Sequence, residues 1–311
     1  MGRVLIFLLA AGCGLAQDEL AIRVTVPLVN VAFSVRDSSG KLVTDLAKDD
    51  LEVLDDGLPQ TISFFAHSAD LPLRLGLIAD MSGSQEPFVQ RHDHDLKTFL
   101  DHVLTPRDRA FLICFGNHLR LASDFSASPE ELSAGLKRFD KNADEMTEIG
   151  PVEHRELGTA FYDALYYSIS EKLASVDTGR KALIVFSDGE DNSSAHNMLD
   201  AIESAQSQDV VFFGIRYTER DRKGRLTARN KYGTSVMARI GRETGGLDFD
   251  AEKVDLSRAF GEIGEELRSS YELAYRAPNA GDGTFHKIVI RSKRAGLTVR
   301  SKTGYFARES R

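Results

Sequence analysis

The stretch that decides the fold is LRLGLIADMSGS, residues 73–84. Its first part, Leu73–Ala79, is a largely apolar run, which is typical of a strand buried on both faces of a parallel sheet. The run leads directly into Asp80, and Ser82 and Ser84 follow at steps of two. Because alternate residues of an extended segment point to the same side, these three side chains can present oxygens to one point. The glycine between the two serines allows the backbone to bend tightly there.

Apolar runs of the same kind recur along the chain and alternate with amphipathic helical patterns as far as about residue 268. The further predicted strands are Ala110–Phe115, Ala182–Phe186 and Val210–Ile215. The predicted helices are Phe88–Val103, Pro129–Phe139, Thr159–Leu173 and Met198–Ala205. Buried strands that alternate with helices predict a doubly wound, mostly parallel α/β sheet covered on both faces. In such sheets ligands bind outside the carboxyl ends of the strands, where the winding reverses.

Two further elements bring oxygen ligands to that edge. Asp188 follows the strand Ala182–Phe186, so we expect its carboxylate at the same edge as that of Asp80. Thr159 opens a predicted helix and places a hydroxyl at its N-terminus. Carboxylates and hydroxyls are hard oxygen donors, which favour Mg²⁺, with Mn²⁺ or Ca²⁺ as alternatives, over Zn²⁺ or copper. Taken singly, Thr159 is typical of a helix N-cap and each aspartate of a turn; their conjunction favours a metal site.

These motifs resemble those of a von Willebrand factor type A domain with a metal-ion-dependent adhesion site, which has a Rossmann-like fold. The matching motifs are Asp80-Met81-Ser82-Gly83-Ser84, Gly158-Thr159 and Phe186-Ser187-Asp188-Gly189. More closely, and over nearly its whole mature length, the chain resembles the bacterial exported "VWFA-related" proteins of the Acidobacteria type. The segments that carry this closer likeness are Asp50–Val53 with Asp56-Gly57, Arg107–Phe111, Arg242–Gly246 and Lys302–Phe306.

The resemblance implies metal contact through the hydroxyls of Ser82, Ser84 and Thr159. It also implies that Asp80 and Asp188 act on the metal directly or through water. The function then expected is divalent-metal-dependent binding of an unknown protein ligand, with no enzymatic turnover. Two carboxylates nearly balance a dication and neutral hydroxyls leave it electrophilic, so an Asp or Glu carboxylate of the partner would complete the coordination.

Two alternative functions stay open at this point. A metal-dependent hydrolase or phosphotransferase could use the same ion as a Lewis acid, but no general base is evident in the motifs. A structural scaffold protein could carry a vestigial metal site. Capture of a partner with and without a chelator would separate the binding module from the scaffold, and turnover of phosphoesters would favour the enzyme.

The two ends of the mature chain are β-rich. Val29–Val35 and Tyr271–Tyr275 have strand composition, and Asp55-Asp56-Gly57 is a turn signal. Strands after the last helix need partners, and those near the N-terminus match them in composition. The predicted organisation is therefore an N-terminal β segment, a type A domain and a C-terminal β segment that packs with the first in a small β-sandwich-like domain. The predicted bounds are 17–70, 71–268 and 269–311.

Residues 1–16 predict an export signal. Arg3 supplies a positive charge, Val4–Ala11 is an apolar run too short to span a membrane, and Gly14-Leu15-Ala16 offers small residues before a cut. A second interpretation is a lipid anchor at Cys13, because Ala10–Cys13 resembles a lipoprotein signal. We therefore expect a chain exported to the periplasm or the extracellular space, secreted or lipid-anchored, with no transmembrane span.

Composition excludes other classes of protein. The 311 residues include 39 Lys and Arg against 47 Asp and Glu, a net charge of −8, so the chain lacks the basic character that nucleic acids select. Only Cys13 and Cys114 are present, which rules out a disulfide-stapled fold. Two polar features have structural interpretations. We expect His92 to be a packed helix histidine, and the basic segment Thr218–Gly233 to be a solvated loop.

Overall fold

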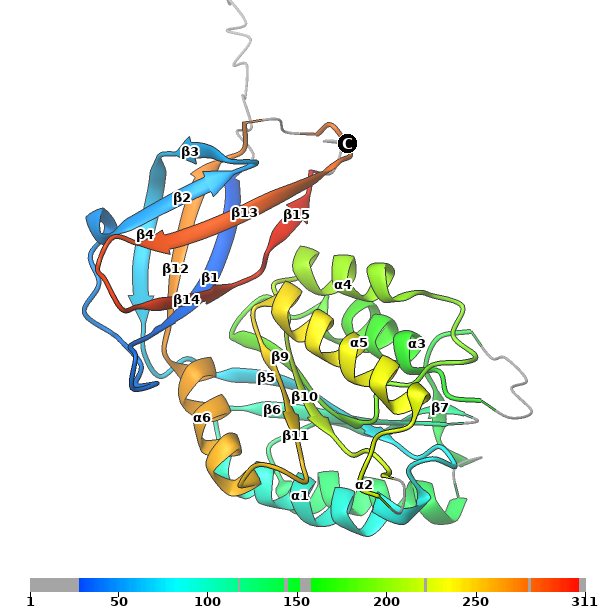
Figure 1. Cartoon of the computed structure of the whole chain (residues 1–311). Helices are drawn as coiled ribbons and strands as arrows, with labels where there is room; N and C mark the ends of the chain where they lie inside the picture. Colours follow the sequence, from blue (N-terminus) through cyan, green and yellow to red (C-terminus); the bar gives the residue numbers. More distant parts are fainter. Residues whose placement is uncertain are drawn as a thin grey trace, which may run out of the picture.

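A sheet of seven strands with helices on both faces forms the larger part of this computed structural model (Figure 1). The structure describes residues 28–116, 118–142, 145–151, 158–220, 223–278 and 281–307, so the predicted signal with Cys13 lies outside the described residues. The strands are β5 (Leu73–Asp80), β6 (Arg109–Phe115), β7 (Leu119–Ser126), β8 (Thr147–Glu148), β9 (Arg180–Ser187), β10 (Val211–Arg216) and β11 (Leu247–Asp250).

The order of the strands in space is β11-β10-β9-β5-β6-β7-β8. The five strands β11, β10, β9, β5 and β6 run parallel, and β7 and β8 extend the sheet in the antiparallel sense. The chain starts in the middle of the sheet at β5 and winds outward in both directions. The predicted fold class, a doubly wound and mostly parallel sheet, is confirmed by this order.

The helices bury both faces of the sheet. One face carries α1 (Val89–Val103), α2 (Pro129–Asn142) and α6 (Leu256–Arg268). The other carries α3 (Phe161–Tyr167), α4 (Met198–Ser207) and α5 (Ala228–Thr244). Two short segments, the 3₁₀ turn η2 (Glu86–Phe88) and the π-helix η4 (Ser168–Leu173), adjoin α1 and α3. Because residues of β5 alternate between faces, Leu77 packs into the α1 side and Ile78 into the α3 side.

Strands from both ends of the chain form a separate β region beside the helices (Figure 1). One four-stranded sheet has the order β14-β1-β12-β4 and the other β15-β13-β2-β3. The strands are β1 (Leu28–Arg36), β2 (Leu51–Asp55), β3 (Leu58–Gln60), β4 (Ile62–Ser68), β12 (Ser270–Arg276), β13 (Phe285–Ser292), β14 (Thr298–Ser301) and β15 (Gly304–Phe306), with the 3₁₀ turn η1 (Lys48–Asp50) before β2. Their inner faces share one apolar core, so the central α/β sheet is inserted into a β-sandwich-like domain.

Helix α6 joins the two parts of the molecule and leads into β12 through Ser269 alone. Near its end, Glu266 is buried and accepts hydrogen bonds from β-region side chains. Ser34 Oγ donates to Glu266 Oε1 at 2.8 Å, and Arg300 Nη1 donates to Oε2 at 2.7 Å. Arg36 Nη2 donates to the same Oε2 at 3.0 Å. These bonds fix the orientation of α6 against β1 and β14.

Local differences from the sequence-based predictions concern helix limits and some of the strands. The loop predicted over Thr218–Gly233 is wrong at its end, because α5 begins at Ala228 and Thr227 Oγ1 caps it by accepting from the Asn230 N–H (3.1 Å). The helix predicted from Thr159 begins at Phe161 as α3 and ends as the π-helix η4. Three strands of the central sheet, β7, β8 and β11, were not predicted. Within the described residues, no helix is both long and apolar enough to cross a membrane.

Candidate metal centre

The structure brings Asp80 and Asp188 to the same edge of the central sheet. Asp80 is the last residue of β5, and Asp188 follows β9, the neighbouring parallel strand. Ser187 Oγ, at the end of β9, donates to Asp80 Oδ2 at 2.6 Å and accepts from the Gly189 N–H at 3.0 Å. This bridge fixes the two strand ends to each other and holds the Asp80 carboxylate in one orientation.

Two hydroxyls and one carboxylate oxygen lie in a chain of short contacts. Ser82 Oγ and Ser84 Oγ are 3.2 Å apart, and Ser84 Oγ donates to Asp188 Oδ2 at 2.9 Å. The Ser82 N–H donates to Asp80 Oδ1 at 3.0 Å, which curls the segment around the first carboxylate. An octahedral Mg²⁺ with bonds of about 2.0–2.1 Å places neighbouring oxygens about 2.9 Å apart. These spacings therefore fit an ion of that size.

Both carboxylates of the site are buried, with Asp80 0% and Asp188 1% exposed. Burial and the nearby Asp188 charge raise the pKa of Asp80 to about 7, against the opposing effect of hydrogen bonds from Ser187 and Ser82. A like charge close to a poorly solvated carboxylate disfavours its ionised state, here that of Asp80. A dication placed between them would offset this repulsion, so the electrostatics of the site fit a divalent metal.

Thr159 reaches this edge through the loop that follows Asp188. Its N–H donates to Asn192 Oδ1 at 2.7 Å, and its carbonyl accepts from the Asn192 N–H at 3.1 Å. The residue is 5% exposed and precedes α3, so it lies in the turn before the helix. Hydrogen bonds join Asp80, Ser82, Ser84 and Asp188 to one another. The hydrogen bonds given above for Thr159 run instead to Asn192, four residues after Asp188.

Sequence reasoning missed two residues that shape this site. Gln85 is 1% exposed and donates through Nε2 to Asp188 Oδ2 at 2.9 Å, and its N–H donates to the Ser82 carbonyl at 2.9 Å. Ser187, described above, is the second. Each directly follows or precedes a predicted ligand, but an amide or hydroxyl at those positions has no distinctive spacing. The available signal was position alone, since Gln85 adjoins the first motif and Ser187 lies inside the last one.

Helix α5 packs directly on the loop that carries Asp188. A Cβ at Gly233 would lie 2.3 Å from the Asp188 carbonyl oxygen, and a Cβ at Gly189 would lie 2.6 Å from the Gly233 carbonyl oxygen. Gly189 also has a φ of +78°, which favours glycine. The position of Asp188 therefore depends on a close contact between backbones that no larger residue permits.

His92 lies in the core next to the site and is 0% exposed. Its ring packs on Tyr217, with centroids 4.5 Å apart, and more distantly on Phe186 at 6.3 Å. Burial lowers the pKa of His92 to about 3, so the imidazole is neutral. The prediction of a packed helix histidine is confirmed.

Comparison with known proteins gives matches among solved structures alone, since no family model and no curated protein matches this chain. BatB from Bacteroides thetaiotaomicron is 16% identical over 62% of this chain and 98% of its own, with a TM-score of 0.44. PTMP1 from the mussel byssus, with a zinc-occupied MIDAS motif, is 16% identical over 68% of this chain and 50% of its own, with a TM-score of 0.47. Manganese-loaded TRAP from Plasmodium vivax is 14% identical over 81% of this chain and 100% of its own, with a TM-score of 0.43.

The three solved structures are at most 16% identical to this chain. Their TM-scores are all below 0.5. The fold class stated above therefore rests on the strand order of this chain itself.

Proposed function

We propose that this chain is an exported module that binds another protein through a divalent cation at the edge of the central sheet. The cation is of the Mg²⁺ class, with Mn²⁺ or Ca²⁺ as alternatives. The residues that would hold it are Asp80, Ser82, Ser84, Thr159 and Asp188. A carboxylate of the partner would occupy a coordination position that the chain leaves to water.

One observation carries this proposal, the close spacing of three oxygen atoms. Ser84 Oγ lies 3.2 Å from Ser82 Oγ on one side and 2.9 Å from Asp188 Oδ2 on the other. Hydroxyls are weak ligands and do not neutralise a cation. An ion held by two carboxylates and several hydroxyls therefore retains attraction for a further anionic oxygen, and an Asp or Glu side chain of a partner supplies one.

Binding is favoured over turnover because the carboxylate placed to accept from Ser84 Oγ, that of Asp188, is itself a proposed metal ligand and is not free to act as a base once an ion is bound. Ser84 Oγ already donates to Asp188, and Gln85 occupies the same carboxylate oxygen. His92, the histidine nearest to the motif in sequence, is neutral and packed against Tyr217. A hydrolase would need a general base within hydrogen-bond reach of its nucleophile.

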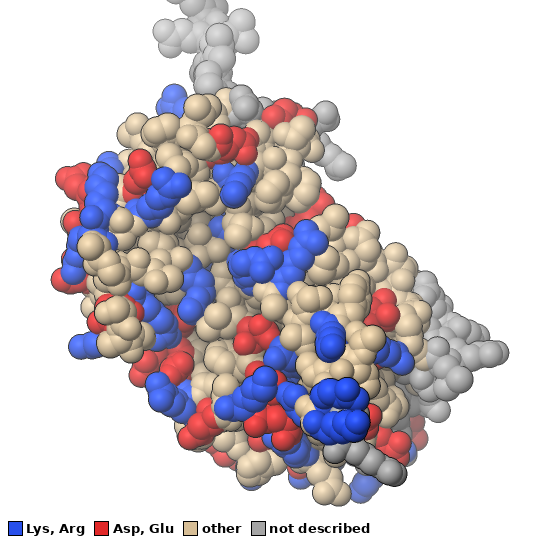
Figure 2. All heavy atoms as spheres, in the orientation of Figure 1, with Lys and Arg blue, Asp and Glu red and all other residues tan. Residues whose placement is uncertain are grey.

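A protein partner also agrees with the charge of the molecule. Figure 2 shows acidic and basic side chains interspersed over the visible face, with no continuous basic stripe there. The net charge of the chain is −8. Nucleic acids would select a basic surface, so we keep a protein ligand as the proposed partner.

Calorimetric titration of Mg²⁺ into the full chain tests the metal part of the proposal. We expect saturable binding by the wild type and loss of binding in Asp188→Ala. The matched control is Asp101→Asn, which changes an exposed aspartate on α1. Absence of Mg²⁺ and Mn²⁺ binding to the wild type would favour the scaffold with a vestigial site.

Chemical cross-linking in the native envelope, followed by capture with and without EDTA, tests the partner. A specific partner should be recovered by the wild type and by Asp101→Asn with Mg²⁺ present, and lost with EDTA or in Asp188→Ala. Recovery of the partner that is unchanged by EDTA and by Asp188→Ala would contradict metal-mediated binding, and metal-dependent hydrolysis of phosphoesters would support the enzyme instead.

N-terminal mass spectrometry of the native chain tests export. A chain that starts at Gln17 supports secretion, and a lipid-modified Cys13 supports a lipid anchor. An intact Met1 would contradict export.

A further inference from the structure

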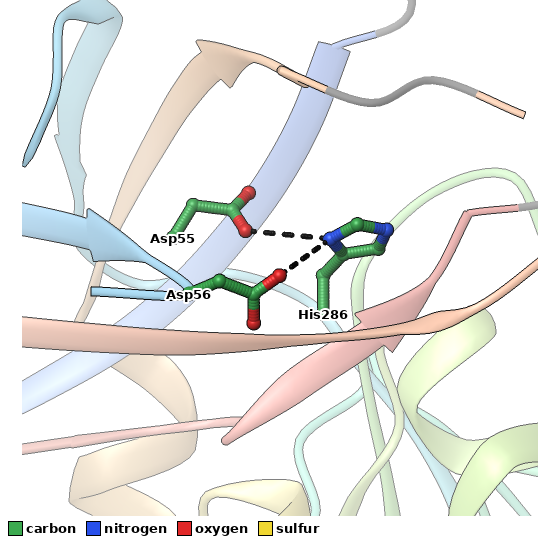
Figure 3. Close-up of side chains that lie close together, drawn as sticks. All are labelled: Asp55, Asp56 and His286. Carbon is green, nitrogen blue, oxygen red and sulfur yellow. Dashed lines mark hydrogen bonds and ion pairs between the residues drawn. The ribbon is translucent and has the colours of Figure 1, made fainter. Parts of the chain in front are cut away.

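A cluster of titratable side chains lies in the β region, outside the predicted metal motif (Figure 3). Asp55 ends β2, Asp56 begins the turn to β3, and His286 lies on β13. Asp55 pairs with Ile288 in the antiparallel ladder, so His286, two residues away, faces the same side of the sheet. His286 is 230 or more positions from the two adjacent aspartates on the chain, and the pairing of β2 with β13 brings it to them.

Three donor atoms converge between these side chains. His286 Nδ1 lies 2.9 Å from Asp56 Oδ2 and 3.7 Å from Asp55 Oδ1. One ligand atom from each residue lies within 4.8 Å of the other two. A tetrahedral ion with nitrogen and oxygen ligands at about 2.0–2.1 Å separates neighbouring ligands by about 3.3 Å. The observed distances lie on either side of that value, so an ion needs only small side-chain shifts to fit.

The remaining polar atoms of these three side chains are hydrogen-bonded to neighbouring residues. His286 Nε2 contacts Asp282 Oδ1 at 3.1 Å, the arrangement in which a carboxylate orients a metal-binding imidazole. Asp55 Oδ2 accepts from the hydroxyls of Tyr275 at 2.8 Å and Tyr305 at 3.0 Å. The other oxygen of Asp56, Oδ1, accepts from a backbone N–H on β13 at 2.8 Å. Each side chain is thus fixed by one atom and leaves another free to face the centre.

Asp55 Oδ1 is the independent observation that points to a cation. The residue is 0% exposed, and this oxygen has no hydrogen-bond partner. A proton on His286 Nδ1 would be donated to Asp56, the nearer carboxylate, and would leave Asp55 Oδ1 unsatisfied. A buried carboxylate oxygen without a partner is costly. A cation between the three donor atoms would give Asp55 Oδ1 a partner and would also bind Asp56 Oδ2.

Charge leads to the same conclusion. Asp55, Asp56 and Asp282 surround one imidazole, so even a protonated His286 leaves two negative charges in excess. A dication bound to neutral imidazole reduces the excess to one. The side chains of Asp56 and Asp282 are 47% and 39% exposed, which gives an ion a path from solvent.

We propose that Asp55 Oδ1, Asp56 Oδ2 and His286 Nδ1 form a second divalent-metal site, suited to Zn²⁺ and similar first-row ions. Imidazole nitrogen with two carboxylates is a ligand set that such ions prefer over Mg²⁺. Water would complete the coordination. The ion would bind the β2–β3 turn to β13 and stabilise the β region, independently of the function proposed for the sheet-edge site.

The test is a calorimetric titration of Zn²⁺ into the full chain with Mg²⁺ in excess, in the wild type and in Asp188→Ala. Both should bind one Zn²⁺ with similar affinity. Asp56→Asn should weaken Zn²⁺ binding at least about 10-fold, and His286→Gln at least as much. The matched control His94→Gln, which changes an exposed histidine on α1, should bind as the wild type does.

Asp56→Asn keeps the experiment decisive if His286→Gln does not fold. Asp56 has a left-handed φ of +48°, which asparagine also adopts readily, so this variant preserves the turn. A rise in melting temperature on Zn²⁺ addition, present in the wild type and absent in Asp56→Asn, is the second readout. No saturable Zn²⁺ binding by the wild type, or undiminished binding by Asp56→Asn, would overturn the proposal.

Discussion

The sheet-edge site and the Asp55–Asp56–His286 cluster differ in how the chain assembles them. At the sheet edge, each ligand belongs to a short motif that directly follows a strand or precedes a helix, and all its donors are oxygens. In the cluster, one ligand comes from a turn near the start of the chain and another from a strand 230 residues later. Local motifs are visible in a sequence, whereas a site made by strand register becomes visible only with the fold.

The largest expected effect tests whether the two sites are separate. Asp188→Ala should lower Mg²⁺ affinity at least about 100-fold, because it removes a buried carboxylate that contacts Ser84 and Gln85, and should leave Zn²⁺ affinity unchanged. Asp56→Asn should have the reverse pattern. Calorimetric titration of both ions into both variants measures this. A single variant that lowers the affinity for both ions to the same extent would show that the two sites are not separate.

Asp108 shows how a buried carboxylate is satisfied without a metal, and so sharpens the contrast with Asp55. Arg268 Nη2 donates to Asp108 Oδ2 at 2.6 Å, the Leu73 N–H donates to Oδ1 at 2.7 Å, and Thr105 donates to Oδ2 from N–H and hydroxyl, both at 2.6 Å. Asp108→Asn should lower the free energy of unfolding at pH 7 by about 3 kcal/mol. Urea unfolding of the variant against Asp101→Asn measures the loss.

The same residue gives a pH dependence. Burial alone would raise the pKa of Asp108, but hydrogen bonds from Arg268 and Thr105 hold it below its ordinary value. A lowered folded-state pKa contributes stability above the unfolded-state pKa of about 3.9, and that stability is lost as pH falls through the folded-state value. Wild-type stability should therefore fall more steeply than that of Asp108→Asn below about pH 4. Parallel acid profiles would contradict this role.

A substitution at Gly233 tests whether backbone packing positions the sheet-edge site. The added Cβ of Gly233→Ala would meet the Asp188 carbonyl oxygen at 2.3 Å, so the loop or α5 must move. We expect a loss of about 2 kcal/mol in unfolding free energy and a fall in Mg²⁺ affinity on the order of 10-fold, with Zn²⁺ affinity unchanged. Gly261→Ala, where a Cβ meets nothing within 4 Å, is the control. Equal Mg²⁺ affinity in both variants would show that the packing of α5 does not position the sheet-edge site.

The smallest effect concerns the outer contacts of the cluster. Tyr305→Phe removes one of two hydroxyls that donate to Asp55 Oδ2, and the Tyr275 hydroxyl remains. We expect Zn²⁺ affinity to fall by up to about 10-fold and stability by about 1 kcal/mol or less. Zinc titration and thermal melting measure the two effects. A change in Mg²⁺ affinity in this variant would show that the sites are coupled.

Sequence patterns predicted the central sheet well, for a physical reason. Parallel strands buried on both faces must be apolar along their length, and β5 and β9 have that composition. Strand β7 escaped prediction because it lies toward the antiparallel side of the sheet and mixes polar with apolar residues. Helix α5 was predicted in part as a loop, because its first two turns contain a glycine and several polar residues. That glycine is required by the contact with Asp188.

Prediction of the sites from sequence was limited by how far apart their residues lie along the chain. The structure joins Asp80, Ser82, Ser84 and Asp188 by hydrogen bonds, and metal binding by them stays a prediction. The role of Gln85 depends on the path of the loop after Ser84, which no periodicity encodes. Asp55 and Asp56 were predicted only as turn residues, but Asp55 ends strand β2 and Asp56 lies in the turn that follows. Their proposed ligand role depends on the pairing of β2 with β13, and a single sequence does not specify that register.

The pairing of β1 with β12 has a consequence for how the chain reaches its native state. β1 is the first described strand, and both strands that flank it, β12 and β14, come from the last part of the chain. At a synthesis rate of about 5–20 residues per second, β1 would wait about 10–50 s for its partners. During that time its unpaired edges are open to other chains. The central sheet can form first, so the β region closes last, and chaperones that cover an exposed strand should act on this protein at its N-terminal end.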